Sequence, residues 1–353
     1  MRAVILPQFG PPEVLREETV PVPVPGPGEV LVQVAAVSIG RVLDLAARAG
    51  RHPYPGFRFP HVLGAEHAGV IAGLGPAAPG WRLGDHVAAF PVVTDGTCYY
   101  CLRGYDEACE NMQLIGIHRP GAYAQYVTVP VANLSAVPAD ISPAEATGLA
   151  LSGAVAMNQL QRSGFAPADW VLVQGASSAL GSVTASLALH LGAQVILTSR
   201  SPAKREQLAR IGADAVLDPL DPGFAGQVRD QTGGRGASIV VDNLGEPRLW
   251  ESSLAALAPT GTLVTSGAFL GTAVSVDLPR LYLQGQRIIG VRTGNAASVA
   301  ALWTEVRRGF RPVLDTPFPL GDAAAAHRYI ENGQNVGRVF LQIPQPGEDE
   351  PCA

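Results

Sequence analysis

Three of the four cysteines lie within twelve residues of one another, at Cys98, Cys101 and Cys109. Thiolates spaced this closely are more typical of a metal site than of a disulfide framework. Metal-binding thiols persist where the surroundings are reducing. We therefore expect a metal in this segment and a soluble, cytoplasmic protein.

A glycine-rich turn, Gln174–Gly181, comes directly after the apolar stretch Val171–Val173 and before a helical pattern. Gly175 permits a tight turn and Gly181 permits close packing of the helix on the strand, while the helix N-terminus attracts a pyrophosphate. A packing turn without a ligand is the alternative. The predicted dinucleotide contacts in this turn are Gly175, Ser177, Ser178, Ala179, Leu180 and Gly181.

The end of the next predicted strand indicates which dinucleotide binds. An NAD site usually has an acidic residue there, which accepts a hydrogen bond from the ribose 2′-hydroxyl. This chain has Ser199 and Arg200 instead, with Lys204 one helical turn later. Hydroxyls and cations suit a 2′-phosphate, so NADPH is predicted. The alternative is that both cations are simply solvated.

The elements that position these residues alternate between strand and helix from about Asp169. This rhythm predicts a doubly wound parallel sheet, and ligands bind such sheets at the carboxyl ends of the strands. Predicted strands are 171–175, 194–198, 214–217, 238–243, 261–266 and 287–292, and predicted helices are 179–191, 202–211 and 246–258. The further cofactor contacts expected at strand ends are Asp242, Asn243, Ser266, Gly267, Arg292 and Thr293.

The first 150 residues are rich in strand-like and Pro/Gly patterns, such as the strand predicted at 30–37. The tail has a predicted strand at 312–320, a helix at 322–331, a last strand at 337–343 and a frayed end at 344–353. The net charge of −5, without any long basic run, argues against nucleic-acid binding. Neither a signal peptide nor a membrane span is expected.

The segment His61–Gly69 resembles the Gly-His-Glu-x-x-Gly signature of medium-chain, zinc-type alcohol dehydrogenases. The resemblance to the medium-chain dehydrogenase/reductase superfamily runs from Ala3 to Leu341 and is closest to its quinone-oxidoreductase and acryloyl-CoA-reductase-like branches. It implies an α/β protein in which a β-rich GroES-like catalytic domain is split by a Rossmann domain. We expect the catalytic domain at 1–150, the NADP-binding Rossmann domain at 151–300 and the return at 301–353.

The resemblance implies two zinc sites, of which this chain keeps the ligands of one. For the structural site, Cys98, Cys101 and Cys109 match three ligands and Asp95 falls where a fourth cysteine normally stands; a lobe with three free thiols is the alternative. For the catalytic site, the three ligand positions fall near Gly40, at Ala65 and near Leu151-Ser152, and none of these is a good ligand. A substitute site would have to come from Asp44, His61, Glu66 and His67.

Without a Lewis acid, conjugate reduction is easier than carbonyl reduction, because the charge spreads to an enolate oxygen. We therefore expect an NADPH-dependent reductase of a small-molecule α,β-unsaturated carbonyl compound. Quinone reduction, carbonyl reduction with a substitute metal and catalytically idle NADPH binding are the alternatives.

The candidate catalytic residues follow from the cleft-facing segment of the family, in which this chain has one extra residue. That segment gives Arg41, Asp44 and Tyr54, and the signature segment adds His67; Tyr54, His67 or water is the proton donor. A loop aromatic and a packed histidine are the alternatives for Tyr54 and His67. Relatives usually pair through strands such as 287–292, so a homodimer is expected.

Overall fold

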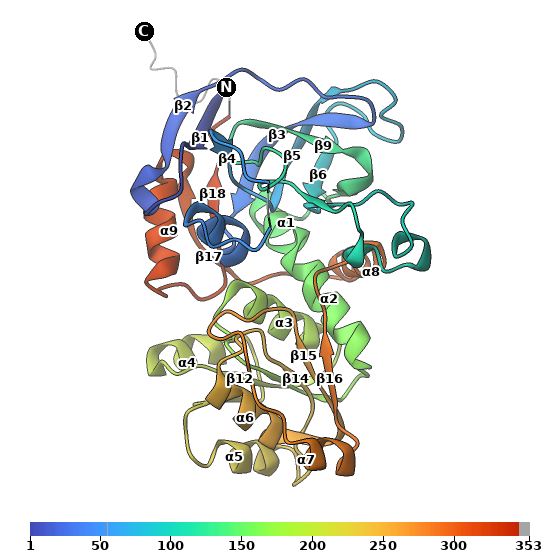
Figure 1. Ribbon diagram of the computed structural model, residues 1–353, viewed down its shortest axis with the longest axis vertical. Coiled ribbons are helices and arrows are strands. Elements are labelled where there is room, and N and C mark those ends of the chain that lie inside the picture. Colours follow the sequence, from blue (N-terminus) through green and yellow to red (C-terminus); the bar gives the residue numbers. More distant parts are fainter. Residues whose placement is uncertain (55, 346–353) are drawn as a thin grey trace. The chain divides into compact units, whose positions relative to one another are not determined.

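The computed structural model describes residues 1–54 and 56–345 of the chain (Figure 1). The chain divides into two compact units, one made of Met1–Leu151 and Leu314–Ala353 and the other of Ser152–Val313. Residues 346–353, most of the expected frayed end, lie outside the described residues. No helix in the described ranges is both long and apolar enough to cross a membrane.

The first unit is organised around β3 (Glu29–Ser38), whose residues alternate between buried and partly exposed along most of its length. β3 pairs antiparallel with β5 (His67–Leu74), β9 (Tyr126–Pro130) and β18 (Arg338–Gln342), so the last strand lies beside one of the first. The sheet runs β10-β6-β5-β3-β18-β17. Its other strands are β6 (His86–Ala89), β10 (Leu134–Ala136) and β17 (Leu314–Pro319).

Two small sheets and two α-helices also belong to the described part of this unit. The small sheets join β1 (Arg2–Leu6) with β2 (Arg16–Thr19) and β4 (His61–Val62), and β7 (Val92–Val93) with β8 (Gln113–Leu114). The helices are α1 (Pro143–Ala150) and α9 (Ala323–Glu331), accompanied by 3₁₀ turns at Pro12–Val14, Cys101–Arg103, Asp106–Ala108, Val131–Asn133 and Leu320–Asp322.

Residues Arg41–Ala46, in the segment that carries two of the candidate catalytic residues, form a π-helix. The backbone N–H of Leu45 donates to the carbonyl of Gly40, five residues earlier, at 3.1 Å. A π-turn accommodates one more residue than an α-turn and occurs often at functional sites.

The second unit is a six-stranded sheet with the order β13-β12-β11-β14-β15-β16, and every pair is parallel. This is the strand order of dinucleotide-binding folds, so the predicted doubly wound sheet is confirmed. The strands are β11 (Trp170–Val173), β12 (Gln194–Thr198), β13 (Ala215–Leu217), β14 (Ala237–Val241), β15 (Leu257–Thr265) and β16 (Arg287–Gly290). The helices are α2 (Ser152–Ser163), α3 (Ala179–His190), α4 (Pro202–Ala209), α5 (Phe224–Gln231), α6 (Pro247–Ala256), α7 (Leu278–Leu283) and α8 (Ala296–Arg307).

Apolar packing explains the limits of this unit. Phe224 and Val228 of α5 and Trp250 of α6 form one core with residues of β11, β12, β14 and β15. α2 packs against α3 and α8. Because α8 belongs to this unit, the chain returns to the first unit at Leu314 rather than at the expected residue 301.

Candidate functional site

The glycine-rich turn has the geometry that a pyrophosphate site requires. Gly175 has a φ of +64°, which favours glycine. Ser178 caps α3, its hydroxyl accepting the backbone N–H of Gly181 at 3.0 Å. A Cβ on Gly181 would lie 2.5 Å from the carbonyl oxygen of Gly175, so only glycine fits. The close packing at Gly181 therefore brings the N-terminus of α3 beside the turn after β11, an arrangement typical of pyrophosphate sites.

The end of β12 combines the expected groups with one that the sequence did not predict. Ser199 is buried and Arg200 is exposed. Arg205 donates to the carbonyl of Ser199 at 2.8 Å and pairs with Asp218, which follows β13, at 3.0 Å. A carboxylate therefore does lie near this position, but it is paired with a cation. The two residues are thirteen positions apart, and no periodic pattern in the sequence predicts that they pair.

The residues at the ends of β14 and β15 differ in role. The Asp242 carboxylate is fully buried and accepts the backbone N–H groups of Leu244 and Gly245 at 2.9 and 3.2 Å. Asp242 thus shapes its own turn. Burial, the largest influence, raises its pKa. The Asn243 side chain and Ser266 are only partly buried and contact Gln159 of α2, which the sequence reasoning missed.

The remaining expected cofactor contacts are spread between the surface and the interior. Gly267 and Arg292 are exposed, whereas Thr293 is 9% exposed. Ser177, Ala179, Leu180 and Lys204 are partly buried.

The four predicted metal ligands lie together. One ligand atom from each of Asp95, Cys98, Cys101 and Cys109 lies within 4.8 Å of the others. Oδ1 of Asp95 accepts from the backbone N–H groups of Thr97 and Cys98, and its Oδ2 accepts from Asn111 at 2.6 Å. The Asn111 hydrogen bond is the largest of the influences that lower the pKa of Asp95. An anionic carboxylate with three convergent thiols fits a tetrahedral zinc site.

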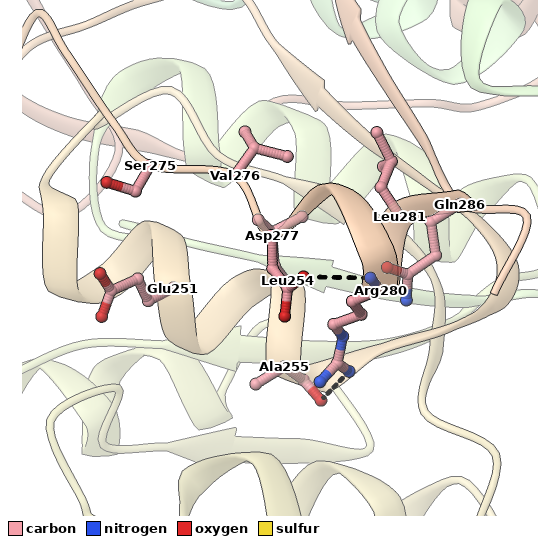
Figure 2. Close-up of a pocket in the computed structure, with 9 residues that line it drawn as sticks. All are labelled: Glu251, Leu254, Ala255, Ser275, Val276, Asp277, Arg280, Leu281 and Gln286. Atoms are coloured by element: carbon pink, nitrogen blue, oxygen red, sulfur yellow. Dashed lines mark hydrogen bonds between the residues drawn. The ribbon is translucent and has the colours of Figure 1, made fainter. Parts of the chain in front are cut away.

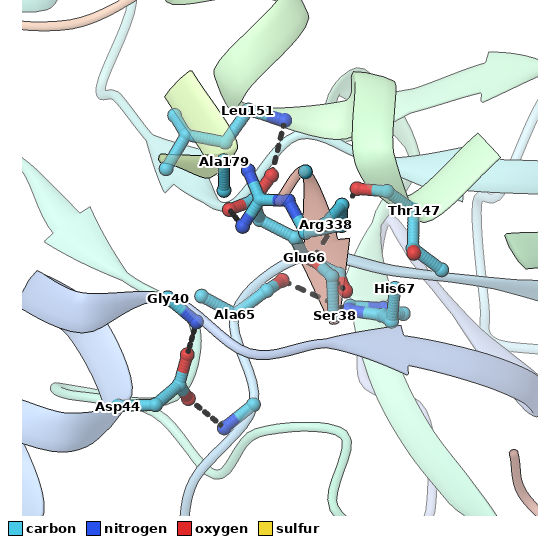
Figure 3. A network of polar contacts seen from close by, with 12 residues as sticks. Ser38, Gly40, Asp44, Ala65, Glu66, His67, Thr147, Leu151, Ala179 and Arg338 are labelled. Carbon is cyan, nitrogen blue, oxygen red and sulfur yellow. Dashed lines mark hydrogen bonds and ion pairs between the residues drawn. The ribbon is translucent and has the colours of Figure 1, made fainter. Parts of the chain in front are cut away.

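The residue beside Ala65 forms an ion pair rather than part of a second ligand cluster (Figure 3). Ala65 is buried, and the carboxylate of its neighbour Glu66 pairs with Arg338 of β18 at 2.9 Å. The other Glu66 oxygen accepts the backbone N–H of Leu151 at 3.3 Å. Among the described residues, the Asp95 group is the only convergent set of three or more potential ligands. The residues around Ala65 therefore do not fit a catalytic zinc.

Asp44, within the π-helix, contacts the loop between β4 and β5 that contains Ala65 (Figure 3). Its carboxylate accepts the backbone N–H of Gly40 at 2.7 Å and that of Gly64 at 3.0 Å, and its side chain is 1% exposed. Burial is the main reason that its pKa rises to about 7, and the negative charge of Glu66 adds to this. Asp44 holds the two segments in which the family's first two zinc ligands would stand.

His67 and Arg41 also make internal contacts. His67 is fully buried and its Nδ1 lies 3.0 Å from the carbonyl oxygen of Ala65, so this nitrogen carries the proton. Burial lowers the pKa of His67 to about 4, so the ring is neutral at pH 7. Arg41 donates to the carbonyl of Ile330 in the last turn of α9, where a cation is favourable. These contacts favour structural roles for both residues.

Tyr54 is half-buried in a cluster of rings. Its ring centre lies 4.6 Å from that of His52 and 6.0 Å from that of His118. Burial lowers the pKa of His52 to about 4, so this neighbour is neutral at pH 7. Nearby, His61 lies 3.0 Å from the carbonyl of Gly116. Of the four candidate catalytic residues, Tyr54 is the one that carries a hydroxyl, and the residue is only partly buried.

A separate cavity of about 260 Å³ lies between α6 and α7 (Figure 2). Arg280 crosses its floor and donates to the carbonyl of Ala255, two residues before β15 begins. The cavity is therefore near the amino end of β15, whereas dinucleotides bind at carboxyl ends. It is lined by Glu251, Leu254, Ala255, Ser275, Val276, Asp277, Arg280, Leu281 and Gln286.

Comparison with known proteins gives two family matches. Residues 26–139 match the alcohol dehydrogenase GroES-like domain and residues 179–308 match the zinc-binding dehydrogenase family. The chain is 33% identical to L-galactonate-5-dehydrogenase of Escherichia coli over 85% of its length and 87% of that protein's. It is 30% identical to 2-haloacrylate reductase of a Burkholderia species, over 98% of this chain and 99% of that protein. An NAD-dependent alcohol dehydrogenase of known crystal structure is 34% identical in sequence and superimposes with a TM-score of 0.88. The match covers 98% of this chain and 100% of that one.

Replacing the Asp44 carboxyl should change how stability depends on pH. The folded protein holds a proton on Asp44 up to about pH 7, whereas the unfolded chain releases it near pH 4. The folded state thus binds more protons in this interval, so Asp44 makes the free energy of unfolding fall as pH rises from about 4 to 7. Asp44→Asn should flatten this fall, measured by urea unfolding at several pH values. The exposed Asp221→Asn is the control, and an unchanged slope in Asp44→Asn would contradict the prediction.

Proposed function

Because this chain belongs to the medium-chain dehydrogenase/reductase superfamily, we propose that it is an NADPH-dependent reductase of α,β-unsaturated carbonyl compounds. Its relatives are oxidoreductases that act on small molecules. The observation that carries the proposal is the ion pair of Glu66 and Arg338 beside Ala65, where the residues do not fit a catalytic metal. One relative's name, 2-haloacrylate reductase, denotes an acceptor with a conjugated alkene, which supports the same class.

The residues proposed to hold the cofactor follow the parallel sheet. The N-terminus of α3, from Gly175 to Gly181, takes the pyrophosphate, and Ser199, Arg200 and Lys204 take the 2′-phosphate. NADPH, when bound, supplies a hydride to the β-carbon of the acceptor. The remaining contacts are proposed at Asn243, Ser266, Gly267, Arg292 and Thr293, whereas Asp242 shapes the turn beneath them.

Tyr54 is proposed as the proton donor. Addition of a hydride at the β-carbon leaves a negative charge on the carbonyl oxygen, as an enolate that hydrogen-bond donors stabilise. The Tyr54 hydroxyl then protonates the α-carbon and regains its proton from solvent, which its half-buried position permits. His67 suits this role less because it is buried and neutral.

A structural zinc and a homodimer are also proposed. Asp95, Cys98, Cys101 and Cys109 would hold the zinc, away from the reacting atoms. β16 is an edge strand of the second unit's sheet, and the neighbouring helix α7 exposes 70% of Tyr282 and 74% of Leu283. An unpaired strand edge beside exposed apolar side chains suits pairing with a second copy.

Native mass spectrometry tests both of these proposals. We expect the mass of two chains with two zinc ions, and loss of the zinc in Cys101→Ser. Two zinc ions per chain, or a monomer at micromolar concentration, would contradict them.

Cofactor choice is tested by Arg200→Ala. Loss of a cation that binds phosphate should raise the Kd for NADPH about tenfold, roughly 1.4 kcal/mol, while the Kd for NADH changes less than twofold. Binding is measured by fluorescence titration, with the exposed Arg210→Ala at the end of α4 as the control. Equal affinity of the native protein for NADPH and NADH would contradict the proposed preference for NADPH.

The fate of the transferred hydrogen tests the reaction. With NADPH deuterated on the transferred face and an enone as acceptor, the label should appear on the β-carbon of a saturated ketone, as read by NMR. Tyr54→Phe should lower kcat at least tenfold and leave the Kd for NADPH nearly unchanged. Label on a carbinol carbon would indicate carbonyl reduction, and absence of oxidation with enones, quinones and aldehydes would indicate an idle binder.

A further inference from the structure

Helix α2 carries a buried amide that joins the turns after two strands of the parallel sheet. The Gln159 side chain is 0% exposed, and its Nε2 donates to Oδ1 of Asn243 at 2.8 Å and to Oγ of Ser266 at 2.7 Å. The same Asn243 oxygen accepts the backbone N–H of Ser266 at 2.7 Å. Since that atom of Asn243 accepts a backbone hydrogen bond, the Gln159 atom facing it must be the amide nitrogen.

The preceding residue of α2 makes a similar contact with a third turn. The Asn158 amide, 2% exposed, donates to the carbonyl oxygen of Thr293 at 2.7 Å. Thr293 follows β16, so two consecutive amides of α2 contact the turns after β14, β15 and β16. α2 also packs directly against β15 (Figure 1).

The sheet order indicates which half of a dinucleotide these turns serve. The glycine-rich turn follows β11, and the residues expected to bind the adenosine ribose follow β12, on one side of it. β14, β15 and β16 lie on the other side. Since a dinucleotide lies across the carboxyl ends of the strands with its pyrophosphate at the central turn, the nicotinamide half falls to these three turns.

In the part of the chain that the structure describes, only the nitrogen of the Gln159 amide forms hydrogen bonds. Its Oε1 is buried and has no hydrogen-bond partner among the described residues. An unpaired buried acceptor destabilises the fold, so an apolar side chain would fill this position at less cost. A requirement for the two donated hydrogen bonds explains why an amide stands here.

We propose that Gln159 and Asn158 are positioning residues for the nicotinamide half of the cofactor, acting through Asn243, Ser266 and Thr293. The proposal rests on the cofactor part of the proposed function and not on the identity of the acceptor. The two amides hold the three turns at fixed distances from one another. The surface that contacts the nicotinamide is therefore formed before the cofactor binds.

The test compares two ligands that share the adenosine half. Isothermal titration calorimetry measures Kd for NADP⁺ and for 2′,5′-ADP, which lacks the nicotinamide half, with native protein and Gln159→Met. Loss of two donated hydrogen bonds should raise the Kd for NADP⁺ at least fivefold, while the Kd for 2′,5′-ADP changes less than twofold. The matched control is Gln161→Met, on the exposed part of the same helix, which should change neither value.

The other outcomes are equally informative. An unchanged Kd for NADP⁺ would overturn the proposal, and so would an equal loss for both ligands, because that indicates general distortion. If Gln159→Met does not fold, Asn158→Leu should show the same selective loss through Thr293, and its failure to do so would overturn the proposal. A native protein that prefers NAD⁺ overturns only the cofactor choice, and NAD⁺ and ADP then replace the two ligands. A native protein that binds no dinucleotide overturns both proposals.

Discussion

The buried ion pair between Glu66 and Arg338 is the interaction on which the first unit depends. The two side chains are 5% and 3% exposed, and removal of one partner from such a pair costs about 3–5 kcal/mol, because the other charge is left uncompensated. Glu66 lies between β4 and β5, whereas Arg338 begins β18 at the far end of the chain. Since Glu66 also accepts the backbone N–H of Leu151, the pair joins both ends of the unit near the point where the chain leaves it.

The same surroundings set the charge available for chemistry near Ala65. Glu66 is neutralised by Arg338, the pKa of Asp44 is raised to about 7, and His67 is neutral at pH 7. Such a site has little positive charge to offer a developing alkoxide. An enolate shares its charge between the oxygen and the α-carbon and needs less stabilisation at one point. Electrostatics and the missing ligand at Ala65 therefore favour the same class of acceptor.

The sequence predicted the features that repeat or lie close along the chain. Strand β12 begins and ends where the strand–helix alternation placed it after Gly192, at Gln194 and Thr198. The convergence of Asp95 with three cysteines followed from short spacing and from resemblance. Glycines at 175 and 181 have the conformation and close contacts that the turn demands. Each of these depends on local backbone geometry, which a sequence records directly.

Contacts between distant residues were not predictable in the same way. Gln159 and Asn243 are 84 residues apart, and nothing local to either identifies the other. An amide within the apolar run around Met157 was the one available signal. The burial of His67 and the pairing of Arg205 with Asp218 likewise depend on tertiary packing. The domain boundary at Leu314 was missed because α8, whose pattern was not recognised, extends the second unit.

The central claim is that reduction proceeds here without a catalytic metal. The most direct measurement follows enone-dependent NADPH oxidation in protein dialysed against EDTA, with zinc counted in the same sample. We expect an undiminished rate in protein that retains no more than one zinc per chain. A rate that falls in proportion to loss of a second zinc per chain, and returns when zinc is added, would contradict it.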